Sequence, residues 1–140
     1  MTSADSSRQD PPAASHEQPV ILVCDDLFFQ SKLEIMVRET GYRAMPLALP
    51  LDWKNTQPQV ASSAIAVIVD LELQKNAAVE VIEWICKKLP RLPVIAFGPH
   101  VKKEALVDAS RAGATHSWPR SRLVRELPTL LHELASARSK

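Results

Sequence analysis

Three short runs of apolar residues, none interrupted by a polar side chain, constrain the fold of this chain more than any other feature. They are VILVC, AIAVIV and PVIAF, at residues 20–24, 64–69 and 93–97. Apolar runs of this length without alternation are typical of strands that are buried on both faces, and such strands occur in parallel sheets covered by helices. The sequence therefore favours an α/β fold built on a parallel sheet.

Helical periodicity and two weaker strands fill the rest of this pattern. Apolar residues recur at helical spacing in four segments, at 29–37, 79–89, 101–109 and 123–134. Asn76 is a candidate N-cap for the second helix, and Pro128 is expected in or near the first turn of the last. A strand is predicted at 42–49, at a sheet edge because of Pro46, and another at 115–119. With right-handed crossovers, the alternation predicts a doubly wound, five-stranded parallel sheet of order 2-1-3-4-5 in a three-layer α/β/α, flavodoxin-like arrangement.

The chain divides into a tail and one domain. Residues 1–18 are dominated by Ser, Asp, Gln and Pro, so we expect a disordered N-terminal tail, followed by a single domain at 19–138. The first residues show no basic stretch followed by an apolar one, and no apolar run is long enough to span a membrane. We therefore expect a cytoplasmic domain.

Charge and cysteine content exclude several classes of function. The formal net charge is +1, which gives no indication of a nucleic-acid or membrane partner. Cys24 and Cys86 lie inside apolar patterns, as expected of small core residues in a reducing compartment. The cysteines and the four histidines do not show the spacing of a zinc site.

Acidic residues follow two of the predicted strands. Asp25 and Asp26 come directly after the first apolar run, and Asp70 ends the third strand. In a 2-1-3-4-5 sheet these strands are neighbours at the switch in strand order, so we expect the three carboxylates to converge. Like charges in one cleft raise each other's pKa or require a cation, and oxygen-rich acidic sites suit Mg²⁺. One of the acids would then be available as a nucleophile toward phosphorus.

Four stretches of the sequence together resemble the receiver domain of bacterial response regulators (CheY-like). They are ILVCDD, VIVDLEL, LPVIAFG and AGATHSWPRS, and the resemblance spans roughly residues 19–137. It implies that Asp70 accepts a phosphoryl group from a histidine kinase or phosphotransfer protein. It also implies that Asp25, Asp26 and Asp70 hold Mg²⁺, with the backbone carbonyl of Glu72 as a further ligand.

The second half of the receiver pattern departs from the family. Gly98 stands where receivers have a Thr or Ser whose hydroxyl binds the phosphoryl group, and Ser117 stands at the position of the aromatic switch residue. Arg120 replaces the phosphate-binding Lys, and Ser121 replaces the Pro that follows it. Arg favours planar pairing with a carboxylate, so we expect Arg120 either to form an ion pair with Asp70 or to contact the phosphoryl group. These features indicate an atypical, degenerate receiver.

Two functions fit these observations. The first is a stand-alone receiver of a two-component phosphorelay, with Asp70 phosphorylated in the presence of Mg²⁺ and output by protein contact. The alternative is a phosphorylation-independent pseudo-receiver that acts as an interaction module. In either case the resemblance implies an output face on the helix at 101–109, the strand at 115–119 and the helix at 123–134, which also allows a homodimer. Trp84 is predicted to be exposed for a partner. An enzyme is not expected, because the three glycines form no phosphate-binding loop.

Overall fold

The fold is a parallel sheet in the predicted strand order. The computed structural model describes residues 18–47, 63–73 and 77–138, apart from the side chains of residues 137 and 138. Within that part of the chain the strands are β1 (Pro19–Val23), β2 (Arg43–Pro46), β3 (Ala66–Asp70), β4 (Val94–Gly98) and β5 (His116–Pro119). Every neighbouring pair is parallel and the order is β2-β1-β3-β4-β5, which confirms the predicted topology.

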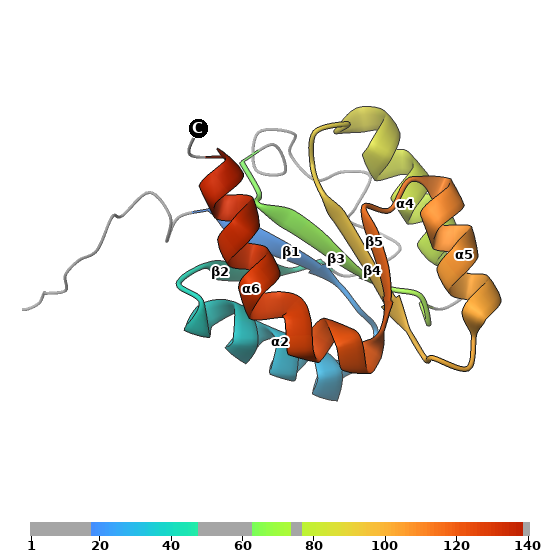
Figure 1. Ribbon diagram of the computed structural model, residues 1–140, viewed down its shortest axis with the longest axis horizontal. Helices are drawn as coiled ribbons and strands as arrows, with labels where there is room; N and C mark the ends of the chain where they lie inside the picture. Colours follow the sequence, from blue (N-terminus) through green and yellow to red (C-terminus); the bar gives the residue numbers. More distant parts are fainter. Residues whose placement is uncertain (1–17, 48–62, 74–76, 139–140) are drawn as a thin grey trace, which may run out of the picture.

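Helices cover both faces of this sheet (Figure 1). The helices of the described residues are α2 (Leu27–Glu39), α4 (Ala77–Lys88), α5 (Lys103–Ala112) and α6 (Arg120–Arg138). Helices α2 and α6 lie on one face, and α4 and α5 lie on the other. The result is the predicted three-layer α/β/α arrangement.

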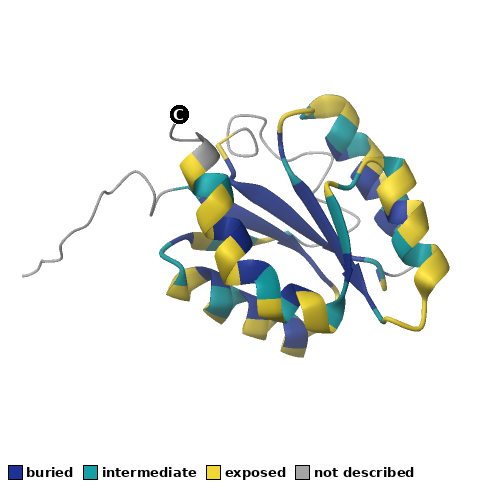
Figure 2. Cartoon of the chain, in the orientation of Figure 1, coloured by how far each residue is buried: buried dark blue, intermediate teal, exposed yellow. Residues whose placement is uncertain are grey.

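The two faces have different cores. Strands β1, β3 and β4 are buried along their whole length, as the dark central strands of Figure 2 show. The core under α2 and α6 contains the buried aromatic residues Phe29, Tyr42, Phe97 and Trp118. The core under α4 and α5 is built from buried Val, Ile, Leu and Ala. Because burying one large apolar side chain stabilises a fold by about 1.5–3 kcal/mol, both layers hold the sheet firmly.

A glycine fixes the turn from α5 into β5. Gly113 caps α5 in the left-handed conformation, with φ at 119°, and its N–H bonds to carbonyls of the last turn. A Cβ at this position would also lie 2.6 Å from Sγ of Cys86 on α4. The close approach of α5 to α4 therefore requires a residue without a side chain here.

Two expectations about the helices are wrong. Helix α6 begins at Arg120, directly after β5, so Pro128 lies inside the helix and not in its first turn. Pro128 is exposed, and it supplies no N–H to the hydrogen bonds of the helix. On α4 the buried residues are Ala78, Val81, Ile82 and Ile85; Trp84 is consequently half-buried against that core and is not the exposed residue we predicted.

Some predictions fall outside the described residues. These are the disordered tail over residues 1–17, the end of the strand predicted at 42–49 and the N-cap at Asn76. Among the described helices, none combines the length and the apolar character that crossing a membrane would need.

Candidate functional site

The register of β1 and β3 brings Cys24 and Asp70 together. Val23 pairs with Val69, so the residues that follow in each strand meet at the carboxyl edge of the sheet. The Cys24 thiol donates a hydrogen bond to a carboxylate oxygen of Asp70, with an S···O distance of 3.3 Å. The predicted meeting of the first and third strands at this edge is therefore present, but a thiol makes the direct contact.

Asp70 is enclosed by protein. Its relative exposure is 1%, and among the described residues it is the one polar or charged residue that is buried. The Glu72 backbone N–H donates to one carboxylate oxygen at 2.8 Å, and the Cys24 thiol donates to the other. Burial raises the pKa of Asp70 above its ordinary value, although the Glu72 N–H, the Cys24 thiol and the Arg120 charge act in the opposite direction. Both oxygens of the carboxylate therefore have protein partners.

Cys24 is a member of the site that the sequence did not reveal. It was expected to be only a small core residue, and it is buried. Burial, followed by the negative charge of Asp70, raises the pKa of Cys24 to about 12, so the thiol stays protonated and donates at neutral pH. Its position immediately before the acidic pair was the one available signal, because a residue there faces the end of the neighbouring strand.

Asp26 serves the start of α2. One of its carboxylate oxygens accepts hydrogen bonds from the backbone N–H groups of Phe28 and Phe29, at 3.0 and 3.1 Å. The other oxygen lies 3.8 Å from an Nη of Arg120. An acid at this position satisfies the unpaired N–H groups of the first turn and interacts favourably with the helix dipole.

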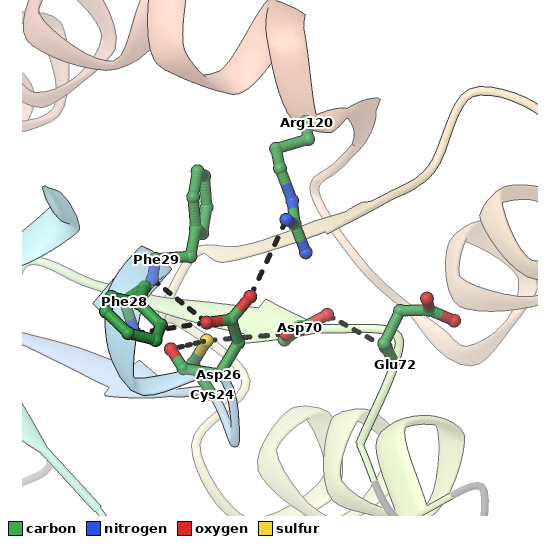
Figure 3. A network of polar contacts seen from close by, with 7 residues as sticks. All are labelled: Cys24, Asp26, Phe28, Phe29, Asp70, Glu72 and Arg120. Atoms are coloured by element: carbon green, nitrogen blue, oxygen red, sulfur yellow. Dashed lines mark hydrogen bonds and ion pairs between the residues drawn. The ribbon is translucent and has the colours of Figure 1, made fainter. Parts of the chain in front are cut away.

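Asp25 and Glu72 do not complete an acidic cluster. Asp25 is exposed, and the Glu72 carboxylate forms an ion pair with Lys102 at 2.8 Å. In Figure 3 the side chain of Glu72 extends away from Asp70, while its backbone N–H faces that residue. Glu72 thus contributes to the site through its main chain.

The arrangement does not fit a divalent cation as it stands. Among the described residues, no group of three or more Asp, Glu, His or Cys side chains is placed to hold a metal ion. Asp26 faces the N–H groups of α2 and Arg120, and Asp70 faces an N–H and a thiol. Mg²⁺ requires near-octahedral oxygen ligands, and the described residues bring no third acidic side chain to Asp26 and Asp70.

Arg120 lies on a shelf of aromatic rings. Its guanidinium is 4.3 Å from the ring centroid of Phe29 and 5.7 Å from that of Phe97, and the two rings are 5.1 Å apart. Figure 3 shows the side chain reaching from the start of α6 toward Asp26. The ion pair of Arg120 is therefore with Asp26 and not with Asp70 as we expected, because the aromatic shelf directs the guanidinium toward α2.

The receiver switch positions are occupied by packing contacts. A Cβ at Gly98 would lie 3.4 Å from Cβ of Leu71, so the edge of β4 is covered closely by the loop after β3. The Ser117 hydroxyl donates to the Leu106 carbonyl of α5 at 2.5 Å. The Ser117 hydroxyl is thus bonded to α5 and not to Asp70, and Gly98 has no side chain that could reach the acid.

Solved structures share this fold. A response regulator receiver domain protein of Clostridium thermocellum matches with a TM-score of 0.75 and 14% identity, covering 87% of this chain and 97% of its own. A receiver protein of Pseudoalteromonas atlantica matches with a TM-score of 0.73 and 18% identity, covering 86% and 98%. This chain has the receiver fold. No family model and no curated protein matches it by sequence.

The receiver fold also occurs under a different name among the similar structures. A putative pilus assembly-related protein of Burkholderia pseudomallei matches with a TM-score of 0.70 and 16% identity, covering 92% of this chain and 96% of its own. At such identities the likeness concerns the fold, and the function has to be argued from the site.

Proposed function

We propose that this chain is a receiver-like signalling module that acts by binding another protein and does not require a phosphoryl group on Asp70. The burial of Asp70, with a protein donor on each carboxylate oxygen, carries this proposal. The module has no catalytic activity of its own and works in the cytoplasm. It corresponds to the pseudo-receiver that the sequence left open.

The geometry around Asp70 disfavours attack on phosphorus. A carboxylate nucleophile needs an oxygen that a donor can approach in line, and here both oxygens are covered. The raised pKa of Asp70 further reduces the share of the reactive anion. Arg120, the candidate partner for phosphoryl charge, is directed to Asp26, and Gly98 supplies no hydroxyl. Each of these features would have to change before a phosphoryl group could be transferred to Asp70.

The output contact is proposed on the face made by α5, β5 and α6. Val107 on α5 is 48% exposed, and Val101 in the loop that precedes this helix is 73% exposed. Exposed apolar side chains beside α5 suit burial against a partner, either another protein or a second copy of this chain. Ser117 holds β5 to α5 through the Leu106 carbonyl, so this face would be presented in one fixed shape.

A second candidate function is phosphorylation of Asp70 by a histidine kinase or phosphotransfer protein, with Mg²⁺ held by Asp25, Asp26, Asp70 and the Glu72 carbonyl. The observation that favours it is the shared edge of β1 and β3, which places Cys24 against Asp70 and starts α2 at Asp26 nearby. A loop movement that separated Cys24 from Asp70 and Arg120 from Asp26 would free these carboxylates for this role.

A phosphodonor experiment separates the two functions. The purified chain is incubated with acetyl phosphate and Mg²⁺, beside a receiver that is known to be labelled, and intact masses are measured. The proposal predicts no added phosphoryl group on this chain. An adduct that forms on the wild type and is absent from Asp70→Asn would establish the second candidate instead.

Partner binding provides the complementary experiment. Proteins that co-purify with the wild-type chain in its host are compared with those captured by Asp70→Asn and by Val107→Asp. The proposal predicts that Asp70→Asn keeps the partners and that Val107→Asp loses them. Loss of the partners in Asp70→Asn would contradict it.

A further inference from the structure

A cavity of about 610 Å³ lies beside the acidic site. Its walls come from α2, from the loops after β3 and β4, and from the junction of β5 with α6. Among the described residues that line the cavity, Glu72 is the one acid. The cavity is not lined by Asp25, Asp26 or Asp70. A volume of this size is within the range of small-molecule sites, which is roughly 300–1,000 Å³.

The cavity carries positive charge. Lys32 and Arg120 both line it, and within the described part of the chain Lys32 has no ion pair. The carboxylate of Glu72 is already neutralised by Lys102 at 2.8 Å. Arg120 is offset by Asp26, at the longer distance of 3.8 Å, and by the charge of Asp70, and neither of these acids lines the cavity. The cavity therefore presents two cations that no acid within it balances.

Arg120 also has hydrogen-bonding capacity to spare. Its side chain is 37% exposed and its ion pair with Asp26 is a long one, so its terminal N–H groups remain available to a ligand, whereas its Nε is buried. The guanidinium lies 4.3 Å from the Phe29 ring centroid, and its N–H groups share one plane, which matches the oxygens of a carboxylate or phosphate. His100 and Ser121 add a ring nitrogen and a hydroxyl to the same lining.

The remaining walls are apolar and stiff. Phe29, Pro99, Pro119 and Val124 line the cavity, and three of these four side chains are rings. Flat apolar surfaces favour a planar ring system in the ligand, since rigid walls lose little freedom when they are covered. The positive charge thus indicates an oxyanion in the ligand, and the apolar walls indicate a planar ring system.

We propose that this cavity binds a small organic oxyanion: a planar ring system that bears a carboxylate or a phosphate group. The ring lies along Pro99, Pro119 and Val124, and the oxyanion is bound by Arg120 and Lys32. Asp26 competes with the ligand for Arg120, because its carboxylate is the present partner of that guanidinium. This inference does not involve Asp70 and stands whether or not Asp70 is phosphorylated.

Calorimetric titrations of the full chain test the proposal. The probes are 2-naphthoate and adenosine monophosphate, with the uncharged 2-naphthamide and adenosine as matched molecules and inorganic phosphate as an oxyanion without a ring. At least one ring-bearing oxyanion is expected to bind about tenfold or more tightly than its uncharged match and than inorganic phosphate. The comparison of 2-naphthoate with adenosine monophosphate then tells a carboxylate ligand from a phosphate ligand.

Four variants locate the binding. Lys32→Gln and Arg120→Gln are each expected to weaken it about tenfold, whereas Lys88→Gln, on α4 at the opposite face, leaves it unchanged. Asp26→Asn keeps a good helix cap and removes the competing charge, so it is expected to strengthen binding severalfold. Lys32 is exposed and its replacement does not disturb the core, which keeps the test valid even if the Arg120 variant folds poorly.

Three results would overturn the proposal. They are no binding of either organic oxyanion at about millimolar concentration, equal binding of the uncharged match or of inorganic phosphate, and equal binding by Lys32→Gln and the wild type. Amide resonances that shift on α4 or α5 instead of around Lys32 and Ser121 would also contradict it.

Discussion

The two halves of the carboxyl edge of the sheet have diverged in opposite ways. The β1–β3 half keeps the acids of a receiver, but protein donors occupy them: Glu72 and Cys24 on Asp70, and the first turn of α2 on Asp26. In the β4–β5 half, Gly98 lies against Leu71 and the Ser117 hydroxyl is bonded to α5. Arg120 lies on the rings of Phe29 and Phe97.

This difference shows that acids at the edge of a parallel sheet can serve the fold itself. In the β1–β3 half the carboxylates act as acceptors that hold a thiol, a loop and a helix start in place. In the β4–β5 half, side chains that would move in a switch are replaced by ones that hold position, such as Ser117 bonded to α5. The site is therefore organised for a single shape.

The largest expected effect comes from the aromatic shelf of the β4–β5 half. Phe97 is fully buried on β4 beneath Arg120, and Phe97→Ala is expected to lower the free energy of unfolding by about 3–5 kcal/mol in urea denaturation. Phe28, which is 91% exposed, is the matched control, and Phe28→Ala should change stability by less than about 0.5 kcal/mol. Equal effects would show that the shelf is not part of the core.

In the β1–β3 half, Asp70→Asn is expected to stabilise the chain at neutral pH. The pKa of Asp70 in the folded state is raised above its ordinary value of 3.8. At a pH between the ordinary and the folded pKa, the folded state therefore holds a proton that the unfolded state has lost. Stability from this group is full below the ordinary value and is lost as pH rises through the folded pKa. Each unit of the difference is worth about 1.4 kcal/mol at pH 7.

Urea midpoints across pH check this prediction. The gain from Asp70→Asn should be largest at neutral pH and shrink as pH falls toward the ordinary value, while the amide still accepts the Glu72 N–H. Asp108→Asn, an exposed acid on α5, is the control and should show little effect. A loss of stability in Asp70→Asn at neutral pH would mean that the anion is the form that the fold prefers.

A smaller effect is expected at Arg120. Arg120→Lys keeps the charge but loses the flat contact with Phe29, and we expect a loss of about 0.5–1 kcal/mol in thermal or urea unfolding. Arg125→Lys, whose partner is the adjacent Glu126 at the surface, is the control and should be nearly neutral. No difference between the two would indicate that the ion pair with Asp26, and not the stacking, holds Arg120.

The smallest effect is expected at Gly98. The Cβ of an alanine there would be in ordinary contact with Leu71, so Gly98→Ala should change stability by less than about 0.5 kcal/mol. Gly113→Ala is the contrasting variant, because its φ is 119° and its Cβ would lie 2.6 Å from Cys86. It should cost about 1–3 kcal/mol. A large loss at Gly98 would show that β4 tolerates no side chain at this edge.

The sequence predicted the layers, the strand order and the edge at which Asp26 and Asp70 lie, because apolar runs and topology determine these features. It did not predict the partners of the acids. The Cys24 thiol reaches Asp70 through the register of β1 on β3, and Arg120 reaches Asp26 through rings from α2 and β4. Such contacts depend on side-chain directions in three dimensions. Pro128 was misplaced because no loop separates β5 from α6.

The most direct test of this account is the pKa of the Asp70 carboxyl, followed by ¹³C NMR in a carboxyl-labelled chain with and without Mg²⁺. The account predicts a pKa above the ordinary 3.8 that stays the same when Mg²⁺ is added, because burial sets it and protein donors occupy both oxygens. A pKa at or below the ordinary value that falls further with Mg²⁺ would contradict it and would establish Asp70 as a metal-binding carboxylate.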